Sequence, residues 1–306
     1  MTNSTVSESL PINPRHVQLQ FNRAQRPDEA EFLYGEIANR MLDRLRLIRL
    51  TPSTMLDAGC GFGARTAMLR QRYPQTKLIS QDHHEGLLKR LRQEQGLDSF
   101  KQKLRRLRSP ILHETLLADL AQTQLSAESI ELVWSNLALH WHPRVHDVIR
   151  EWGRILQPEG LAFFSYFGPG TAIELRRAIA TAQLETEAMP FVDMHDLGDM
   201  LIEHGFADPV MDQEVLTLTY EDPQTLLRDA RVLGGNANNA RRANLVSKGW
   251  LARLMQALES QRNADGHLTL TLEICYGHAW RRAIRQLGTE TRISLQSIGR
   301  RQSSDF

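Results

Sequence analysis

The stretch MLDAGCGFG at residues 55–63 limits the possible folds more than any other part of the chain. It is a short apolar run that contains Asp57 and ends in three closely spaced glycines, which let a backbone turn sharply from a strand into a helix. The spacing G-x-G-x-G differs from the G-x-G-x-x-G of dinucleotide-binding turns. An acid two residues before the first glycine would repel a pyrophosphate and suits a cationic group. The stretch therefore predicts a turn that binds a positively charged, nucleotide-like cofactor.

Apolar stretches of strand length alternate with stretches of helical periodicity around this turn. The expected strands are 54–58, 77–81, 113–118, 130–136 and 160–167. The expected helices are 29–50, 64–73, 85–95 and 144–156. This alternation is typical of an α/β fold, in which helices cover both faces of a mainly parallel sheet.

The regular alternation of strands and helices ends after Gly170. Helices are expected at 171–185, 196–204, 222–233 and 247–260, and strands at 209–220 and 267–280. The stretch between these last two strands is too long for a simple loop, so we expect a helical cap inserted at about 222–266. We expect one domain over 16–287, between a disordered N-terminus (1–15) and a flexible tail (288–306).

The composition argues against several other classes of protein. The 306-residue chain has a net charge of only +1, so it lacks the basic excess of a general nucleic-acid binder. Its two cysteines, Cys60 and Cys275, lie far apart and no Cys/His ligand spacing occurs, so we expect a reduced cytoplasmic environment and no metal site. No apolar stretch reaches the ~20 residues that span a membrane, and the polar N-terminus lacks a secretory signal.

Two further acids stand where neighbouring strands are expected to end. Asp82 follows the strand at 77–81, where an acid can accept hydrogen bonds from a pair of ribose hydroxyls. Asp119 follows the strand at 113–118, within reach of an adenine amino group. Open α/β sheets bind ligands at the carboxyl ends of their strands, so these acids and Asp57 predict one cofactor site. The alternative is that the glycines form a purely structural turn and the aspartates cap helices.

Residues 54–167 resemble the class I S-adenosylmethionine-dependent methyltransferases in these features. The resemblance implies a Rossmann-like fold whose seven-stranded, mainly parallel sheet has an antiparallel last strand. It also implies S-adenosylmethionine as the cofactor, with its ribose at Asp82 and its adenine by Asp119. The residues expected to bind the cofactor are Asp57, Gly59, Cys60, Gly61, Gly63, Asp82, His83, Asp119, Leu120 and Asn136.

Nearly the whole folded chain is similar to a narrower family. The stretches SNLALHW (135–141), FSYFGPGTAIELR (164–176), LTLTLEICYGHAW, FNRAQ (21–25) and LLRDARVLGGNANNARR (226–242) resemble the malonyl-acyl-carrier-protein O-methyltransferases of biotin synthesis. This resemblance implies a malonyl thioester substrate whose free carboxylate attacks the sulfonium methyl group. A carboxylate is ionised at neutral pH, so catalysis would require positioning rather than a general base.

The same resemblance implies an acidic acyl-carrier protein as the partner and a cation that holds the substrate carboxylate. The candidates for that cation are Arg176, Arg231 and Arg241. Each is equally compatible with an ordinary surface charge. A basic docking patch is expected at KQKLRRLR (101–108) or at the pair formed by Arg241 and Arg242. His140 and His142 flank Trp141 and are expected to line the pocket or to form a turn.

The chain departs from the family pattern at several positions. The tyrosine that usually closes over the cofactor is replaced by Gln25 and RPDEA, and Tyr34 lies further along. Phe62 stands where the glycine loop usually has threonine, and His83 and His84 follow the acid of the second strand. Two alternatives therefore stay open. One is a methyltransferase of the same fold that acts on another small acidic molecule, and the other is a non-methylating accessory protein.

Overall fold

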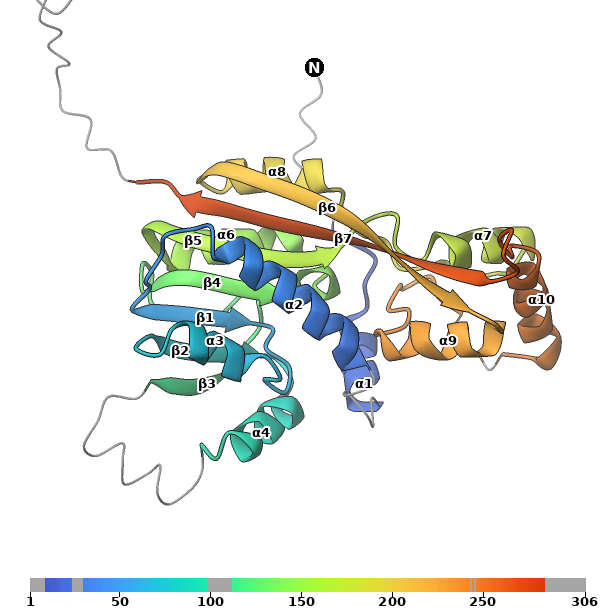
Figure 1. The fold of residues 1–306 in the computed structure, drawn as a ribbon, viewed down its shortest axis with the longest axis horizontal. Coiled ribbons are helices and arrows are strands. Elements are labelled where there is room, and N and C mark those ends of the chain that lie inside the picture. The colour runs from blue at the N-terminus through green and yellow to red at the C-terminus, as the bar shows by residue number, and fades with distance from the viewer. Residues whose placement is uncertain (1–8, 24–29, 98–111, 243, 245, 284–306) are drawn as a thin grey trace, which may run out of the picture.

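The structure is a computed structural model that describes residues 9–23, 30–97, 112–242, 244 and 246–283. Its centre is a seven-stranded sheet of order β3-β2-β1-β4-β5-β7-β6, in which β7 runs antiparallel to its neighbours (Figure 1). The strands are β1 (Thr54–Ala58), β2 (Lys77–Asp82), β3 (His113–Leu117), β4 (Ile130–Asn136), β5 (Leu156–Phe167), β6 (Phe206–Tyr220) and β7 (Leu268–Arg281). The predicted Rossmann-like fold with an antiparallel last strand is confirmed.

Helices cover both faces of this sheet (Figure 1). They are α1 (Pro14–Arg23), α2 (Glu31–Leu45), α3 (Thr66–Arg72), α4 (Glu85–Glu94), η2 (Leu139–Trp141), α6 (Val145–Ile155), α7 (Ile173–Thr181), α8 (Met194–Glu203), α9 (Pro223–Val232) and α10 (Lys248–Glu259). Alternate residues of a strand point to opposite faces, so Trp134 of β4 packs with α2 and α3 while Val133 packs with α6 and α8. The central strands are therefore buried on both sides.

The strands β6 and β7 extend beyond the rest of the sheet, and α7, α9 and α10 gather at their far end (Figure 1). Side-chain caps mark the start of two of these helices, α9 and α10. Asp222 accepts the N–H of Thr225 ahead of Pro223, the first residue of α9, and Ser247 accepts the N–H of Trp250 ahead of α10. The helical group stands next to α1, on the side of the sheet where β1 and β4 end (Figure 1).

The prediction of disorder over 1–15 is wrong for residues 9–15. Ile12 is only 2% exposed and pairs with Asn238 across 226 positions of sequence, and the N–H of Leu10 donates to the carbonyl of Pro143 at 2.8 Å. The segment is mostly polar, which led to the prediction of disorder, but its apolar residues Leu10 and Ile12 bond to loops that are distant in sequence. Residues 1–8 and the predicted tail at 288–306 lie outside the described part of the chain.

Some element boundaries also differ from the predictions. The helix expected at 29–50 ends at Leu45, because the N–H of Leu47 bonds three residues back and the chain turns toward β1. The strand expected from residue 160 begins earlier, at Leu156, which pairs with Ile130. The register then shifts before Leu132 pairs with Leu161, so the residues QPEG (157–160) lie in a bulge within the strand. The helix α1 was not predicted. Among the described residues, no helix is both long and apolar enough to cross a membrane.

Candidate cofactor and substrate site

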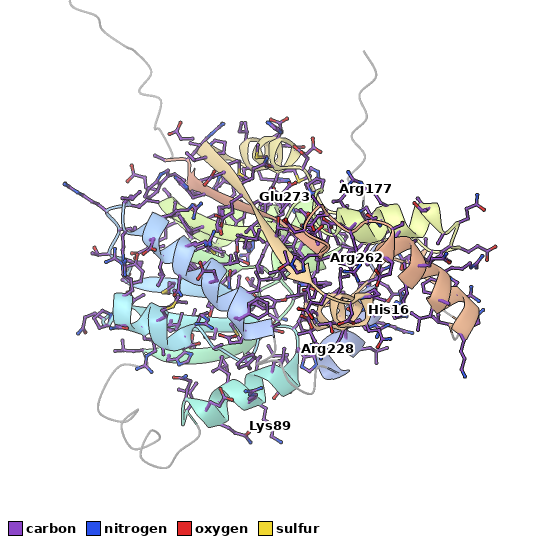
Figure 2. The ribbon with its side chains drawn as sticks, turned by 45° about the vertical axis from the view of Figure 1, so that its right-hand side comes forward. His16, Lys89, Arg177, Arg228, Arg262 and Glu273 are labelled. Carbon is purple, nitrogen blue, oxygen red and sulfur yellow. The ribbon has the colours of Figure 1, made fainter. Side chains whose placement is uncertain are left out.

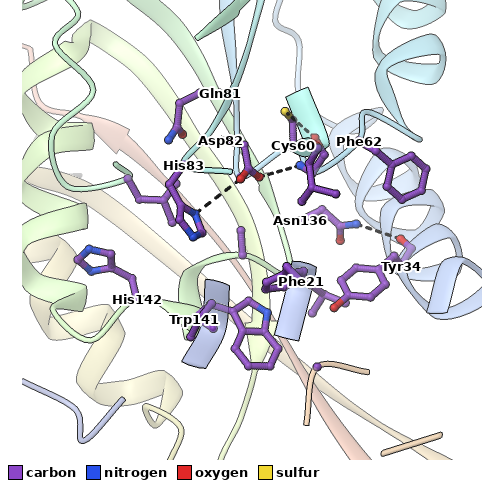
Figure 3. A pocket seen from close by; sticks show the side chains of 18 of the residues that line it. Phe21, Tyr34, Cys60, Phe62, Gln81, Asp82, His83, Asn136, Trp141 and His142 are labelled. Atoms are coloured by element: carbon purple, nitrogen blue, oxygen red, sulfur yellow. Dashed lines mark hydrogen bonds and ion pairs between the residues drawn. The ribbon is translucent and has the colours of Figure 1, made fainter. Parts of the chain in front are cut away.

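A cavity of about 340 Å³ opens where β1, β2 and β4 end. One side is formed by the glycine loop, the end of β2 and the segment after β3. The opposite side comes from α1, the start of α2, η2 and α9 (Figure 3). Of the residues predicted to bind the cofactor, all but Gly63 line this cavity. The chain thus brings the predicted residues together at the edge of the sheet where α/β folds bind ligands.

The glycine loop needs its glycines for different reasons. Gly59 has φ +76°, and an added Cβ would lie 2.3 Å from Cβ of Ala138, so this position brings the loop against the chain after β4. Gly61 has φ +57° and its missing side chain faces open space, which leaves its backbone open to a ligand. Gly63 packs against Leu91 of α4 and shapes the loop from outside the cavity.

Asp82 ends β2 with a carboxylate that is only 7% exposed. Its Oδ2 accepts the N–H of Gly61 at 2.9 Å, and its Oδ1 accepts the N–H of His84 at 2.8 Å. The Nδ1 atom of His83 lies 3.6 Å from Oδ1 (Figure 3). These bonds fix the carboxylate against the glycine loop, and each oxygen keeps acceptor capacity for a ligand hydroxyl.

Asp57 lies beneath the loop and is 5% exposed. Burial, followed by the negative charge of Asp82, raises the pKa of Asp57 to about 7. A cationic group in the cavity would lower that pKa again, because it stabilises the ionised carboxylate. The same burial raises the pKa of the Cys60 thiol well above its ordinary value, so Cys60 lines the cavity as a neutral group.

Asp119 pairs with His142 at the outer end of the cavity. The Nε2 atom of His142 lies 3.2 Å from Oδ1 of Asp119, and its Nδ1 accepts the N–H of Arg144 at 3.1 Å. Nδ1 also lies 3.0 Å from the carbonyl of Arg144, and the hydrogen bond between His142 and Asp119 lowers the pKa of that acid. Among the described residues none bonds Oδ2 of Asp119, so this atom can accept a hydrogen bond from a ligand amino group.

Asn136 and Leu120 line the cavity in supporting roles. The Nδ2 atom of Asn136 donates to the carbonyl of Tyr34 at 2.9 Å, and its Oδ1 accepts the hydroxyl of Ser165 at 3.0 Å (Figure 3). This amide therefore ties the end of β4 to α2 and to β5. Leu120 is buried below Gly59. Both residues thus line the cavity, and their contact with the cofactor stays a prediction.

Only one of the three predicted carboxylate clamps lines the cavity. Arg231 of α9 does so, and among the described residues it makes no ion pair or side-chain hydrogen bond. Arg176 instead donates to two backbone carbonyls, those of Pro169 and Met189. Arg241 is bonded to the ring of His16 at 2.8 Å. The predicted basic patch at 101–108 lies outside the described residues.

Two cavity arginines were missed by the sequence analysis. Arg65, in the turn before α3, is paired with Glu31 at the start of α2, and both residues line the cavity. Arg144 lines it from the segment before α6 and pairs with Asp147 at 3.1 Å. Neither follows a motif that marks a binding arginine, so no sequence signal separated them from surface charges.

Three aromatic side chains enclose the side opposite the glycine loop. They are Phe21 of α1, Tyr34 of α2 and Trp141 of η2 (Figure 3). The rings of Phe21 and Trp141 meet edge to face with centroids 5.6 Å apart. Gly234 fits against the indole, because an added Cβ would lie 2.2 Å from it. Residues 24–29, where the lid tyrosine was expected, lie outside the described chain.

The two histidines beside Trp141 differ. His142 lines the cavity as expected, whereas His140 does not. His140 is packed between Trp141 and Phe167, and burial lowers its pKa to about 3. Its Nδ1 accepts the N–H of Phe167 at 3.4 Å. His140 is therefore a neutral core residue in the single turn of η2, which fits the second of the two alternatives expected for it, a turn instead of a pocket position.

Comparison with known proteins agrees with this arrangement. Residues 56–164 match the family described as "Methyltransferase domain". The malonyl-[acyl-carrier protein] O-methyltransferase of Methylovorus sp. (strain MP688) is 39% identical over 272 residues, which cover 88% of this chain and 90% of that protein. The protein of the same name from Gallionella capsiferriformans is 40% identical over 280 residues, which cover 90% of this chain and 93% of that protein.

A solved structure shows the same fold at much lower sequence identity. The YcgJ protein of a Bacillus species has a TM-score of 0.54 and 13% identity, and the match covers 80% of this chain and 99% of that one. The sheet, the strand-end acids and the extensive identity to the curated relatives agree with one another. The chain therefore belongs to the malonyl-[acyl-carrier protein] O-methyltransferases, a family of class I S-adenosylmethionine-dependent methyltransferases.

Proposed function

We propose that this enzyme transfers the methyl group of S-adenosylmethionine to the free carboxylate of a malonyl group carried by acyl-carrier protein, as a step of biotin synthesis. The shared name of the relatives supports this substrate. The observation that carries the proposal is the cavity itself. Three acids that suit the cofactor line one side, and an arginine without a partner among the described residues lines the other.

The acids match three separate parts of the cofactor. Asp57 suits the ammonium of the methionine moiety, because a cation restores the charge that burial disfavours. Asp82 is placed to accept the two ribose hydroxyls, and Asp119 is placed to accept the adenine amino group. A cofactor bound in this order would have its sulfonium between the glycine loop and the end of β4.

The reaction itself requires little acid–base chemistry. A carboxylate oxygen forms a bond to the methyl carbon while the carbon–sulfur bond breaks, and the bonding electrons remain on sulfur. A sulfonium cation and a carboxylate anion thereby become a neutral thioether and a neutral ester. Charge disappears along the reaction, so an apolar enclosure that excludes water favours the transition state over the charged reactants. Phe21, Tyr34 and Trp141 supply that enclosure.

Arg231 is the best-placed residue to hold the malonyl carboxylate. It lies on α9 at the cavity and has no competing carboxylate partner among the described residues. A guanidinium can bind one carboxylate oxygen and leave the other to attack. The same helix carries a second arginine, Arg228, which Figure 2 labels and which pairs with Asp229 instead of lining the cavity.

The proposal is tested by comparing acceptors with purified enzyme and S-adenosylmethionine. Initial rates of methyl ester formation are measured by mass spectrometry for malonyl-carrier protein, malonyl-coenzyme A, free malonate and acetyl-carrier protein. We expect the carrier-bound malonyl group to have the highest kcat/KM and acetyl-carrier protein, which lacks the free carboxylate, to give no ester. Ester formation on another acid with none on malonyl-carrier protein would assign a different acceptor. No ester on any acceptor despite cofactor binding would favour a non-methylating role.

A further inference from the structure

The side chain of Tyr34 lines the cavity on the side opposite the glycine loop. Tyr34 is in the first turn of α2, and its backbone carbonyl accepts the amide of Asn136 at 2.9 Å. This bond places Tyr34 beside the end of β4. Figure 3 shows its ring on the side of Phe21 and Trp141, across the cavity from Cys60 and Asp82. Tyr34 therefore faces the glycine loop from the opposite wall.

Tyr34 is a neutral group in this position. Burial raises the pKa of its hydroxyl to about 12, and a polar contact with the side chain of Trp141 lowers it in part. The Nε1 atom of Trp141 forms no hydrogen bond of ordinary geometry with the described residues. Both rings line the cavity.

The cofactor places a positive charge near this aromatic surface. With its ammonium at Asp57 and its ribose at Asp82, the cofactor would have its sulfonium between these two groups, over the glycine loop. Gly61 leaves open space there, and Asn136 ends β4 next to it. The aromatic rings are the groups across the cavity from this point, and aromatic faces attract cations.

We propose that Tyr34, together with Phe21 and Trp141, forms an aromatic binding site for the sulfonium cation, so that the protein binds S-adenosylmethionine more tightly than its neutral product S-adenosylhomocysteine. The attraction ends when methyl transfer removes the charge. This difference helps the product to leave.

The test compares the affinities of the two ligands by titration calorimetry. The wild-type protein, Tyr34→Leu and Tyr34→Phe are titrated with S-adenosylmethionine and, separately, with S-adenosylhomocysteine. Phe32→Leu is the matched control, because Phe32 lies on the same helix with 58% of its surface exposed. Thermal unfolding of each variant reports whether it remains folded.

We expect Tyr34→Leu to weaken S-adenosylmethionine roughly threefold to thirtyfold more than S-adenosylhomocysteine, the range of a cation–aromatic contact. Tyr34→Phe should keep the wild-type ratio of the two affinities, since it retains the ring. Equal weakening of both ligands, or no weakening, would overturn the proposal. The ratio does not depend on the methyl acceptor. Its result therefore stands apart from that of the acceptor comparison.

Discussion

The two sides of the cavity are built in different ways. The cofactor side comes from consecutive strand–turn units, in which the glycine loop follows β1 and Asp82 ends the adjacent strand β2. The acceptor side is assembled from α1, the start of α2, η2 and α9, which are far apart in sequence. One side is thus fixed by the register of the sheet and the other by contacts between distant segments.

The acceptor side is held together by contacts between segments that are distant in sequence. Ile12 pairs with Asn238, and Arg241 bonds to His16, which join the N-terminal segment to the chain after α9. Gly234 lies against Trp141. Apart from the three aromatic rings proposed to contact the sulfonium, changes on this side should therefore alter acceptor binding with little effect on the cofactor. The reverse should hold for the acids at the strand ends. The following predictions test this separation.

The largest expected effect is the loss of cofactor binding in Asp82→Ala. Its carboxylate is buried, and two ribose hydroxyls bonded to a charged group are together worth about 3 kcal/mol or more, which is over a hundredfold in affinity. Titration calorimetry with S-adenosylhomocysteine measures this. The same change also removes an acceptor for the N–H of Gly61, so circular dichroism must show a folded protein. An unchanged affinity would refute the assignment of the cofactor side.

The converse variant is Arg231→Gln. We expect kcat/KM for malonyl-carrier protein to fall roughly tenfold to a hundredfold, because a charged hydrogen bond to the carboxylate is lost. The dissociation constant of the cofactor should stay within about twofold, within the spread of surface substitutions. Arg228→Gln is the control, since Arg228 is exposed one turn earlier on α9 and pairs with Asp229. Similar losses in both variants would point to general charge attraction instead of a clamp.

A smaller effect is expected from pH. Asp57 has a pKa raised to about 7 when the cavity is empty, and only its ionised form attracts the cofactor ammonium. The ionised fraction rises with pH, so the affinity for S-adenosylmethionine should strengthen roughly fivefold between about pH 6 and 7. The window below about pH 7.5 keeps the ammonium charged. Asp57→Asn should bind weakly with no such slope, and a slope that persists in this variant would assign the titration to another group.

The smallest expected effect is at the rim of the cofactor side. Asp119 is half-exposed, and its bond to the adenine amino group competes with water. Asp119→Asn should therefore weaken the cofactor only about threefold to tenfold. Replacing adenine by hypoxanthine in the ligand should remove this difference, because the amino group is absent. A loss of affinity as large as that of Asp82→Ala would show that Asp119 and Asp82 contribute equally to cofactor binding.

The sequence predicted the cofactor side well because its signals are local. The glycine spacing and an acid at each strand end require only the positions of strands, and neighbouring parallel strands bring their ends together. Acceptor-side residues carry no such signal. Arg176, Arg231 and Arg241 were equivalent in sequence, and only the structure shows that Arg176 binds backbone carbonyls and Arg241 binds a histidine.

Aromatic residues were harder still to assign. Tyr34 lies in an amphipathic helix, where a tyrosine ordinarily belongs to the core, and its direction depends on the bond between its carbonyl and Asn136. The helix α1 was missed because polar residues surround the few apolar ones that anchor it. In each case the deciding contact joins residues about a hundred or more positions apart, which periodicity over a short window cannot detect.

The most direct test of the account is one turnover with S-adenosylmethionine that carries a ¹³C-labelled methyl group, followed by NMR of the malonyl-carrier protein. The account predicts one labelled O-methyl ester on the malonyl carboxylate, formed at the wild-type rate by Arg228→Gln and far more slowly by Arg231→Gln. An enzyme that binds the labelled cofactor in the cavity yet leaves the malonyl carboxylate unmethylated would contradict it.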